Sequence, residues 1–210
     1  MRILILSCGT RNKVVQYFKD AVGAQGKVIA TDCSQYAPAL YDADSYYIVP
    51  RMTEPGYIDE IITICKNERI DGVLSLIDPE LSLLAQYKKD FEAVGTTVIG
   101  SSYELCEMAL DKWAMYNWLT EHGYRCAKTY VQFSAFEQAL ANGKVTFPVF
   151  VKPRFGGGYP HAYECGVKTP QMIVNNLSGQ QNVPSVGEYR SDVVMMKYNE
   201  LKTLALDEGR

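Results

Sequence analysis

Short apolar runs that alternate with amphipathic stretches fill the first 100 residues and restrict the folds open to this chain. Apolar residues at helical spacing predict helices over residues 12–22 and 57–68 and a third helix through Leu81, Leu84 and Tyr87. Continuous apolar strands separated by helices are typical of a parallel sheet covered on both faces. The first half is therefore predicted to be α/β. The strand-length runs are residues 2–7, 27–31, 45–49, 72–77 and 97–99.

Capping residues and glycines predict where these helices begin and end. Asn12 is expected to cap the first helix, and Gly26 is expected to break it. The buried face of that helix is predicted to carry Val14, Val15 and Phe18. The residues at helical spacing in the second helix are Ile58, Ile61, Ile62 and Cys65.

Polar residues follow the predicted strands at the edge where parallel sheets bind ligands. Crossover connections between such strands are expected to be right-handed. Gly9, Thr10, Asp78 and Glu80 are candidate substrate-binding residues, and Asp78 before Pro79 has helix capping as an alternative role. The polar residues at this edge are Ser7, Thr10, Asp32, Asp78 and Glu80.

The first of these strands ends in a glycine turn that invites comparison with dinucleotide-binding sites. A dinucleotide fingerprint needs three glycines because each one has a separate steric role. Here residues 7–12 supply only Gly9, although Asp32 follows at the end of the second strand. A turn glycine and a strand-end aspartate are therefore favoured over an NAD site.

Composition excludes several other classes of protein. The net charge is -3 without a long basic run, which argues against nucleic-acid binding. The apolar runs are far shorter than a membrane span, and the N-terminus does not resemble a signal peptide. The six cysteines lack metal-binding spacing, and only two histidines are present. We expect reduced, mostly buried thiols in a cytoplasmic protein without structural zinc.

The pattern changes after Gly100. Helices are predicted over 101–110 and 111–122, followed by a helix over 134–142 with Ser134 as its cap. The aromatic residues Trp113, Tyr116 and Trp118 are expected to be core residues of the second of these helices. Further predicted elements are strands at 127–131, 147–152 and 192–198, a glycine-rich loop at 153–160, a helix at 171–177 and a loop at 179–188.

Three motifs in this second half carry a family resemblance. They are Asp111-Lys112 at a helix start, Phe-Pro-Val-Phe-Val-Lys-Pro at 147–153, and Pro-Arg-Phe-Gly-Gly-Gly-Tyr-Pro-His-Ala-Tyr-Glu-Cys-Gly at 153–166. Together they resemble the ATP-grasp superfamily, in particular proteins similar to the carbamoyl-phosphate synthase large subunit. The resemblance implies a Rossmann-like pre-ATP-grasp domain at 1–100. The N-terminal and C-terminal parts of an incomplete ATP-grasp domain then occupy 101–152 and 153–210.

The resemblance also implies roles for particular residues. Lys112 and Lys152 match lysines that hold ATP phosphates, and Arg154 matches an arginine that faces the reacting acyl phosphate. A helix-start lysine, a snorkelling lysine and a structural ion pair are their respective alternatives. Gly156, Gly157 and Gly158 are candidates for approach to the phosphates. The implied cofactors are ATP and Mg²⁺, and the implied substrates are a carboxylate and an amine.

One departure from the family pattern puts activity in doubt. Lys152-Pro153 runs directly into Arg154-Phe155, so the central region of the grasp domain is missing from the sequence. Lys152 then stands where the family has a magnesium-binding asparagine, and a lysine repels a cation. An alternative alignment makes Gly156, Gly157 and Gly158 the phosphate flap, but no metal ligand can be assigned either way.

Three functions remain open at this point. The first is an ATP-grasp ligase that makes an acyl phosphate for attack by an amine or ammonia, and that is inactive as the printed chain. The second is a non-catalytic Rossmann-like binding module or remnant. The third is a nicotinamide-dependent oxidoreductase, disfavoured by the missing glycines. A shortened grasp domain would expose apolar surface, so a homodimer is an open alternative to a monomer.

Overall fold

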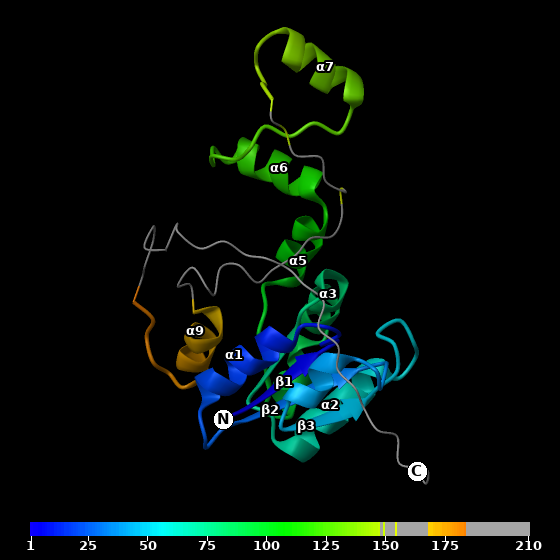
Figure 1. Cartoon of the computed structure of the whole chain (residues 1–210), viewed down its shortest axis with the longest axis vertical. Coiled ribbons are helices and arrows are strands. Elements are labelled where there is room, and N and C mark those ends of the chain that lie inside the picture. The colour runs from blue at the N-terminus through cyan, green and yellow to red at the C-terminus, as the bar shows by residue number, and fades with distance from the viewer. Residues whose placement is uncertain (148, 150–153, 155–167, 184–210) are drawn as a thin grey trace. The chain divides into compact units, whose positions relative to one another are not determined.

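A computed structural model describes residues 1–147, 149, 154 and 168–183 (Figure 1). These residues divide into two compact units. The first unit contains Met1–Leu76, Lys89–Ile99 and residues 168–183, and the second contains Ile77–Lys88 and the described part of 100–158. Across the described ranges, no helix combines the length and the apolar character needed to cross a membrane.

A five-stranded sheet forms the centre of the first unit. Every neighbouring pair is parallel, in the order β3-β2-β1-β4-β5 (Figure 1). Residues 3–6 of the central strand β1 are all fully buried, and alternate residues of a strand point to opposite faces. Both faces are therefore covered, and the predicted parallel α/β sheet is confirmed. The strands are β1 (Arg2–Leu6), β2 (Lys27–Asp32), β3 (Ser45–Ile48), β4 (Gly72–Ser75) and β5 (Thr97–Val98).

The first helix, α1 (Asn12–Val22), packs its predicted face onto the sheet. Val14, Val15 and Phe18 belong to one buried cluster with side chains of β1, β2 and β4, as the sequence predicts. The predicted bounds of 12–22 are confirmed, but the predicted capping residue Asn12 and the predicted breaker Gly26 are wrong. Arg11 is the N-cap residue, and the Asn12 side chain instead donates to the carboxylate of Asp42. The helix ends before Gly23, whose φ of 68° is the left-handed conformation that glycine tolerates best.

The second helix, α2 (Tyr57–Glu68), has the predicted bounds but a different buried face. Ile61 and Cys65 are buried as expected, whereas Ile58 and Ile62 are only partly buried. The rest of the buried face is completed by Tyr57 and Ile64. The short helices η1 (Pro38–Asp42) and α4 (Lys88–Ala93) complete the connections between strands.

A helix from the far end of the described chain completes the core of the first unit. In α9 (Thr169–Leu177), Ile173 and Leu177 pack against the same buried cluster as α1. A methyl group placed on Gly72 would lie 2.7 Å from Leu177 Cδ1. Glycine therefore allows α9 to approach the middle of the sheet. The sequence predicts this helix from residue 171 but does not predict where it packs.

The described part of the second unit is helical. It contains α3 (Asp78–Gln86), α5 (Tyr103–Leu110), α6 (Lys112–Glu121) and α7 (Phe133–Ala141), and α3 packs against α5. Ser102 caps α5 by accepting a hydrogen bond from Leu105 N at 3.3 Å. Asp111 caps α6 by accepting one from Trp113 N at 2.9 Å.

Three predictions for this unit are wrong. Residues 127–131 form no strand, and most of them are exposed. Gln132, not Ser134, is the N-cap residue of α7. α6 has no buried residue, so its aromatic side chains are not core residues. The predicted strands at 147–152 and 192–198, the glycine-rich loop at 153–160 and the later part of the loop at 179–188 lie largely outside the described residues.

Candidate functional site

The turn between β1 and α1 is built around the predicted substrate-binding residues Gly9 and Thr10. Gly9 has φ +52°. Its N–H donates to Asp32 Oδ2 at 2.9 Å, and its carbonyl accepts from Ala39 N at 3.1 Å. The other carboxylate oxygen of Asp32 accepts from Ser34 N at 2.9 Å. Both polar groups of Gly9 and both oxygens of Asp32 therefore already stabilise the turn.

This arrangement bears on the dinucleotide alternative. In dinucleotide-binding sites the acidic residue at the end of the second strand binds the ribose. Here Asp32 is 9% exposed and accepts backbone N–H groups within its own fold. The geometry thus favours the structural role of a turn glycine with a supporting aspartate. Thr10 is exposed beside it.

The cysteine in this turn has a strongly shifted acidity. Burial, together with the negative charge of Asp32, raises the pKa of the Cys8 thiol to about 12. Cys8 therefore stays protonated at neutral pH and is a poor nucleophile. Among the described residues, the other buried thiols are those of Cys65 and Cys106, whereas Cys33 and Cys126 are exposed.

The two acidic candidates Asp78 and Glu80 lie in the first turn of α3, in the second unit. Asp78 is exposed, and Glu80 is fully buried. Ile77 is the N-cap residue, so Asp78 does not cap the helix, although both carboxylates favour its positive end. A substrate arriving from solvent would meet Asp78 and not Glu80.

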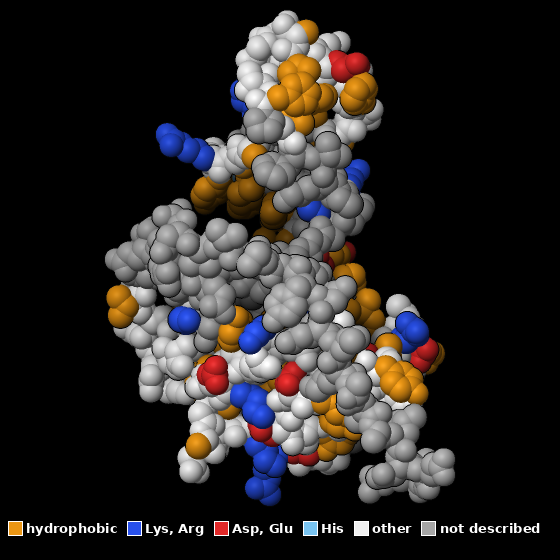
Figure 2. All heavy atoms as spheres, viewed as in Figure 1, with side chains coloured by type: hydrophobic (Ala, Val, Ile, Leu, Met, Phe, Trp, Pro, Cys, Tyr) orange, Lys and Arg blue, Asp and Glu red, His pale blue; other side chains and the backbone are white. Residues whose placement is uncertain are grey.

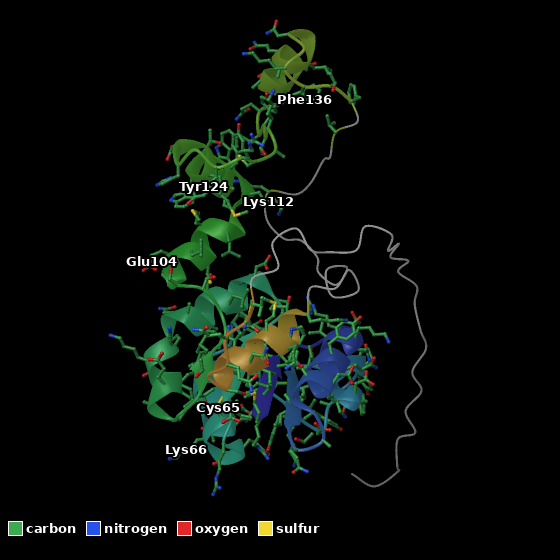
Figure 3. The ribbon with its side chains drawn as sticks, turned by 90° about the vertical axis from the view of Figure 1, so that its left-hand side faces the viewer. Cys65, Lys66, Glu104, Lys112, Tyr124 and Phe136 are labelled. Carbon is green, nitrogen blue, oxygen red and sulfur yellow. The ribbon has the colours of Figure 1, made fainter. Side chains whose placement is uncertain are left out.

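The strongest grouping of predicted site residues lies where α6 begins. Lys112 and Arg154 are 42 positions apart, yet Lys112 N donates to the Arg154 carbonyl at 3.2 Å and Lys112 Nζ lies 3.3 Å from the same oxygen. Figure 3 labels Lys112 at this helix start. Arg154 Nε donates to Asp111 Oδ1 at 2.7 Å, and Arg154 Nη2 pairs with Asp111 Oδ2. We call Asp111, Lys112 and Arg154 the α6 charge cluster.

Electrostatics inside the α6 charge cluster are dominated by the ion pair. The hydrogen bond from Arg154, more than any other cause, lowers the pKa of Asp111 to about 2. The same bond raises the pKa of Arg154. The side chain of Arg154 is 50% exposed and that of Asp111 is 16% exposed. The Asp111–Arg154 pair therefore stays ionised at neutral pH, and the guanidinium of Arg154 is half exposed.

The structure brings together only some of the predicted residues. Lys112 and Arg154 meet in the second unit, whereas Gly9 and Thr10 belong to the first. Within the described part of the chain, no three His, Cys, Asp or Glu side chains gather as metal ligands do. The predicted site residues that lie outside the described ranges are Lys152, Gly156, Gly157 and Gly158.

Sequence reasoning missed the role of Asp111. The Asp-Lys pair was visible at the helix start, and aspartate is a preferred N-cap residue. The bidentate contact with Arg154 spans 43 positions and could not be inferred from local spacing.

Comparison with known proteins finds a family match for the N-terminal part of the chain. Residues 3–99 match the family described as the PylC-like N-terminal domain. This part of the chain is therefore similar in sequence to PylC-like N-terminal domains. The match includes residues of all five strands and leaves out only Arg2 of β1.

A curated relative aligns over a longer part of the chain than this family match. The chain is 25% identical over 113 residues to the carbamoyl phosphate synthase arginine-specific large chain of Bacillus subtilis (strain 168). The aligned part is 54% of this chain and 10% of the relative, so the chain spans a small part of that protein. The match confirms the predicted resemblance to the carbamoyl-phosphate synthase large subunit.

Solved structures with weaker likeness include two ligases. N5-carboxyaminoimidazole synthetase from Staphylococcus aureus, solved with ADP, has a TM-score of 0.49 and 18% identity over 74% of this chain and 39% of its own. The L-amino acid ligase from Bacillus licheniformis has a TM-score of 0.47 and 19% identity over 74% of this chain and 37% of its own.

Proposed function

We propose that the chain is part of an ATP-grasp ligase that joins a carboxylate to an amine or ammonia, as carbamoyl-phosphate synthase-like proteins do. The PylC-like domain and the Bacillus subtilis relative support the family. The observation that carries the proposal is the contact of Lys112 with Arg154 at the start of α6. Lys112 binds the main-chain carbonyl of Arg154 there, so two basic residues far apart in sequence lie side by side, which suits a ligand with several negative charges.

The proposed roles follow from the chemistry of each side chain. The Lys112 ammonium is a compact point charge that can follow a phosphate oxygen. The Arg154 guanidinium offers a planar fork to phosphate. ATP would transfer its terminal phosphoryl group to a substrate carboxylate, and an amine would then displace phosphate from the acyl phosphate. The contribution of this chain would be positioning and charge neutralisation of the phosphates.

Other parts of the proposal extend beyond the described residues. We assign Lys152 and Gly156, Gly157 and Gly158 to the phosphates on the sequence motif alone. Gly9, Thr10 and Asp78 remain candidates for the carboxylate or amine substrate, and the buried Glu80 a weaker one. The division into a pre-ATP-grasp domain at 1–100 and two grasp-domain parts at 101–152 and 153–210 belongs to the same proposal. A cytoplasmic location and a homodimer stay predictions.

We assign no residues to the binding of the expected magnesium ion. The described residues offer no group of three potential metal ligands, and the Asp111 carboxylate is held by Arg154. We therefore propose no step through the metal. We propose instead that the printed chain binds the nucleotide's phosphates without completing ligation, because Lys152 stands where the family has a metal ligand.

Calorimetric titration with ATP, with and without magnesium, tests this function. We expect ATP binding by the unaltered chain, weaker binding by the Lys112→Gln and Arg154→Gln variants, and no ADP formation. The Arg125→Gln variant is a matched control, because Arg125 is exposed and has no place in the cluster. Binding of NAD without ATP would favour an oxidoreductase. Absence of nucleotide binding would favour a module of another kind, and ADP formation would contradict the proposed inactivity.

A further inference from the structure

Asp111 has two structural tasks that use the same carboxylate. Its Oδ1 accepts a hydrogen bond from Trp113 N at 2.9 Å, which caps α6. Oδ1 and Oδ2 together accept the guanidinium of Arg154. An asparagine at this position would keep the capping oxygen, because asparagine and aspartate are comparable N-cap residues. The negative charge is therefore separable from the capping function.

We propose that Asp111 is a specificity-determining residue that occupies the Arg154 guanidinium and yields it only to a polyphosphate. This inference rests on the proposed phosphate-binding role of Lys112 and Arg154. In this proposal the Asp111 carboxylate competes with the ligand for the Arg154 guanidinium. The incoming ligand replaces the Asp111 carboxylate as the partner of Arg154.

The backbone contacts of the cluster allow this exchange without loss of the site. The main chain at Arg154 is anchored through its carbonyl, which accepts from Lys112 N at 3.2 Å. Lys112 Nζ lies 3.3 Å from the same oxygen. Neither contact involves the Arg154 guanidinium or the Asp111 carboxylate. Release of the ion pair would therefore leave Arg154 beside Lys112, with its side chain able to turn toward a ligand.

Charge decides which ligands can compete. Asp111 has one negative charge, whereas Lys112 and Arg154 together have two positive charges. Inorganic phosphate has only slightly more charge than the carboxylate, which is already held in place within the protein. A triphosphate has several phosphate groups that can contact both cations at once. Because the pair is half exposed at Arg154, it is weak enough for such a ligand to displace.

A double-mutant cycle with tripolyphosphate and inorganic phosphate as probes tests the inference. The four proteins are the unaltered chain and the Asp111→Asn, Arg154→Gln and Asp111→Asn/Arg154→Gln variants, titrated calorimetrically at low salt. We expect Asp111→Asn to tighten tripolyphosphate binding about two- to five-fold. The variant should also gain a proportionally larger affinity for inorganic phosphate. Both gains should disappear in the Arg154→Gln background.

The results distinguish failure of this inference from failure of the proposed function on which it rests. If the unaltered chain binds tripolyphosphate and Arg154→Gln weakens it, the phosphate-binding role stands. An unchanged or weaker affinity in a folded Asp111→Asn variant then overturns only the competitor role. If neither the unaltered chain nor Asp111→Asn binds tripolyphosphate, the proposed function and the inference both fail. Circular dichroism of each variant verifies that α6 and the sheet remain folded.

Discussion

The sheet unit and the α6–α7 region use apolar side chains in opposite ways. In the sheet unit, Phe18 and Leu4 are almost completely buried. In the second unit, α6 has no buried residue, and Phe133 and Phe147 are 71% and 67% exposed. Figure 2 shows hydrophobic side chains on the surface around α7. The difference teaches that apolar spacing predicts a helix in both regions, but that it predicts burial of large side chains on α1 and not on α6.

Aromatic residues in the second unit contact one another instead of a core. Trp118 stacks on His122, with ring centroids 4.1 Å apart, and on Tyr124 at 5.9 Å. Trp118 and Tyr124 are nevertheless 39% and 59% exposed. Such pairs contribute about 0.5–1.5 kcal/mol, less than the burial of a whole aromatic side chain in a core.

The largest expected effect is the difference in unfolding free energy lost when one aromatic side chain is truncated in each region. Phe18→Ala is expected to lower the free energy of unfolding of the sheet unit by about 3–5 kcal/mol, because it leaves a cavity under α1. Trp118→Ala should lower the free energy of unfolding of its own unit by about 0.5–1.5 kcal/mol. Denaturant titrations followed by far-ultraviolet circular dichroism measure both. Equal losses from the two variants would contradict the contrast between the regions.

A smaller effect should test how α9 completes the sheet unit. Gly72→Ala would place a methyl group 2.7 Å from Leu177 Cδ1 and 2.8 Å from Ile99 Cδ1. We expect a loss of about 1–3 kcal/mol in unfolding free energy, as overpacking usually causes. Adding Leu177→Ala should make the double variant more stable than the sum of the two single losses predicts. Strict additivity would argue that α9 does not pack on β4.

The sheet could be predicted because its local and tertiary signals agree. Residues 3–6 form a continuous apolar run that is buried on both faces of β1, and α1 places Val14, Val15 and Phe18 on that sheet. The buried face of α2 was harder because Ile58, Ile61, Ile62 and Ile64 surround much of the helix. Local spacing cannot select between such faces, and the final choice depends on tertiary contacts.

The candidate site was only partly predictable for the same reason. The motif resemblance pointed to Lys112 and Arg154 separately, and the structure places them in contact. The predicted strand at 127–131 failed because β propensity requires a neighbouring strand, and the described part of the second unit is helical. Asp111 and Arg154 are 43 positions apart, so their contact could not be predicted from a local sequence pattern.

The smallest expected effect is the loss of the Asp111 contact in the α6 charge cluster at acidic pH. The folded-state pKa of Asp111 is lowered from 3.8 to about 2, so its stabilising contact is complete above about pH 4 and is lost as the pH falls through 2. Both tryptophans of the chain, Trp113 and Trp118, lie on α6, so their fluorescence reports on this helix and not on the sheet. We expect a fluorescence transition near pH 2 that Arg154→Gln moves toward pH 4, because the variant removes the main cause of the lowered pKa.

The matched control for this acid transition is Arg125→Gln, which removes the same charge from an exposed position outside the cluster. Its fluorescence midpoint should equal that of the unaltered chain. If both variants move the midpoint equally, general charge and not the Asp111–Arg154 pair governs the start of α6. Circular dichroism recorded in parallel distinguishes loss of this contact from acid unfolding of the sheet, where the hydrogen bond from Tyr47 and the charge of Arg2 lower the pKa of Glu68. Separate transitions in the two signals would establish that the sheet and α6 lose stability through different carboxylates.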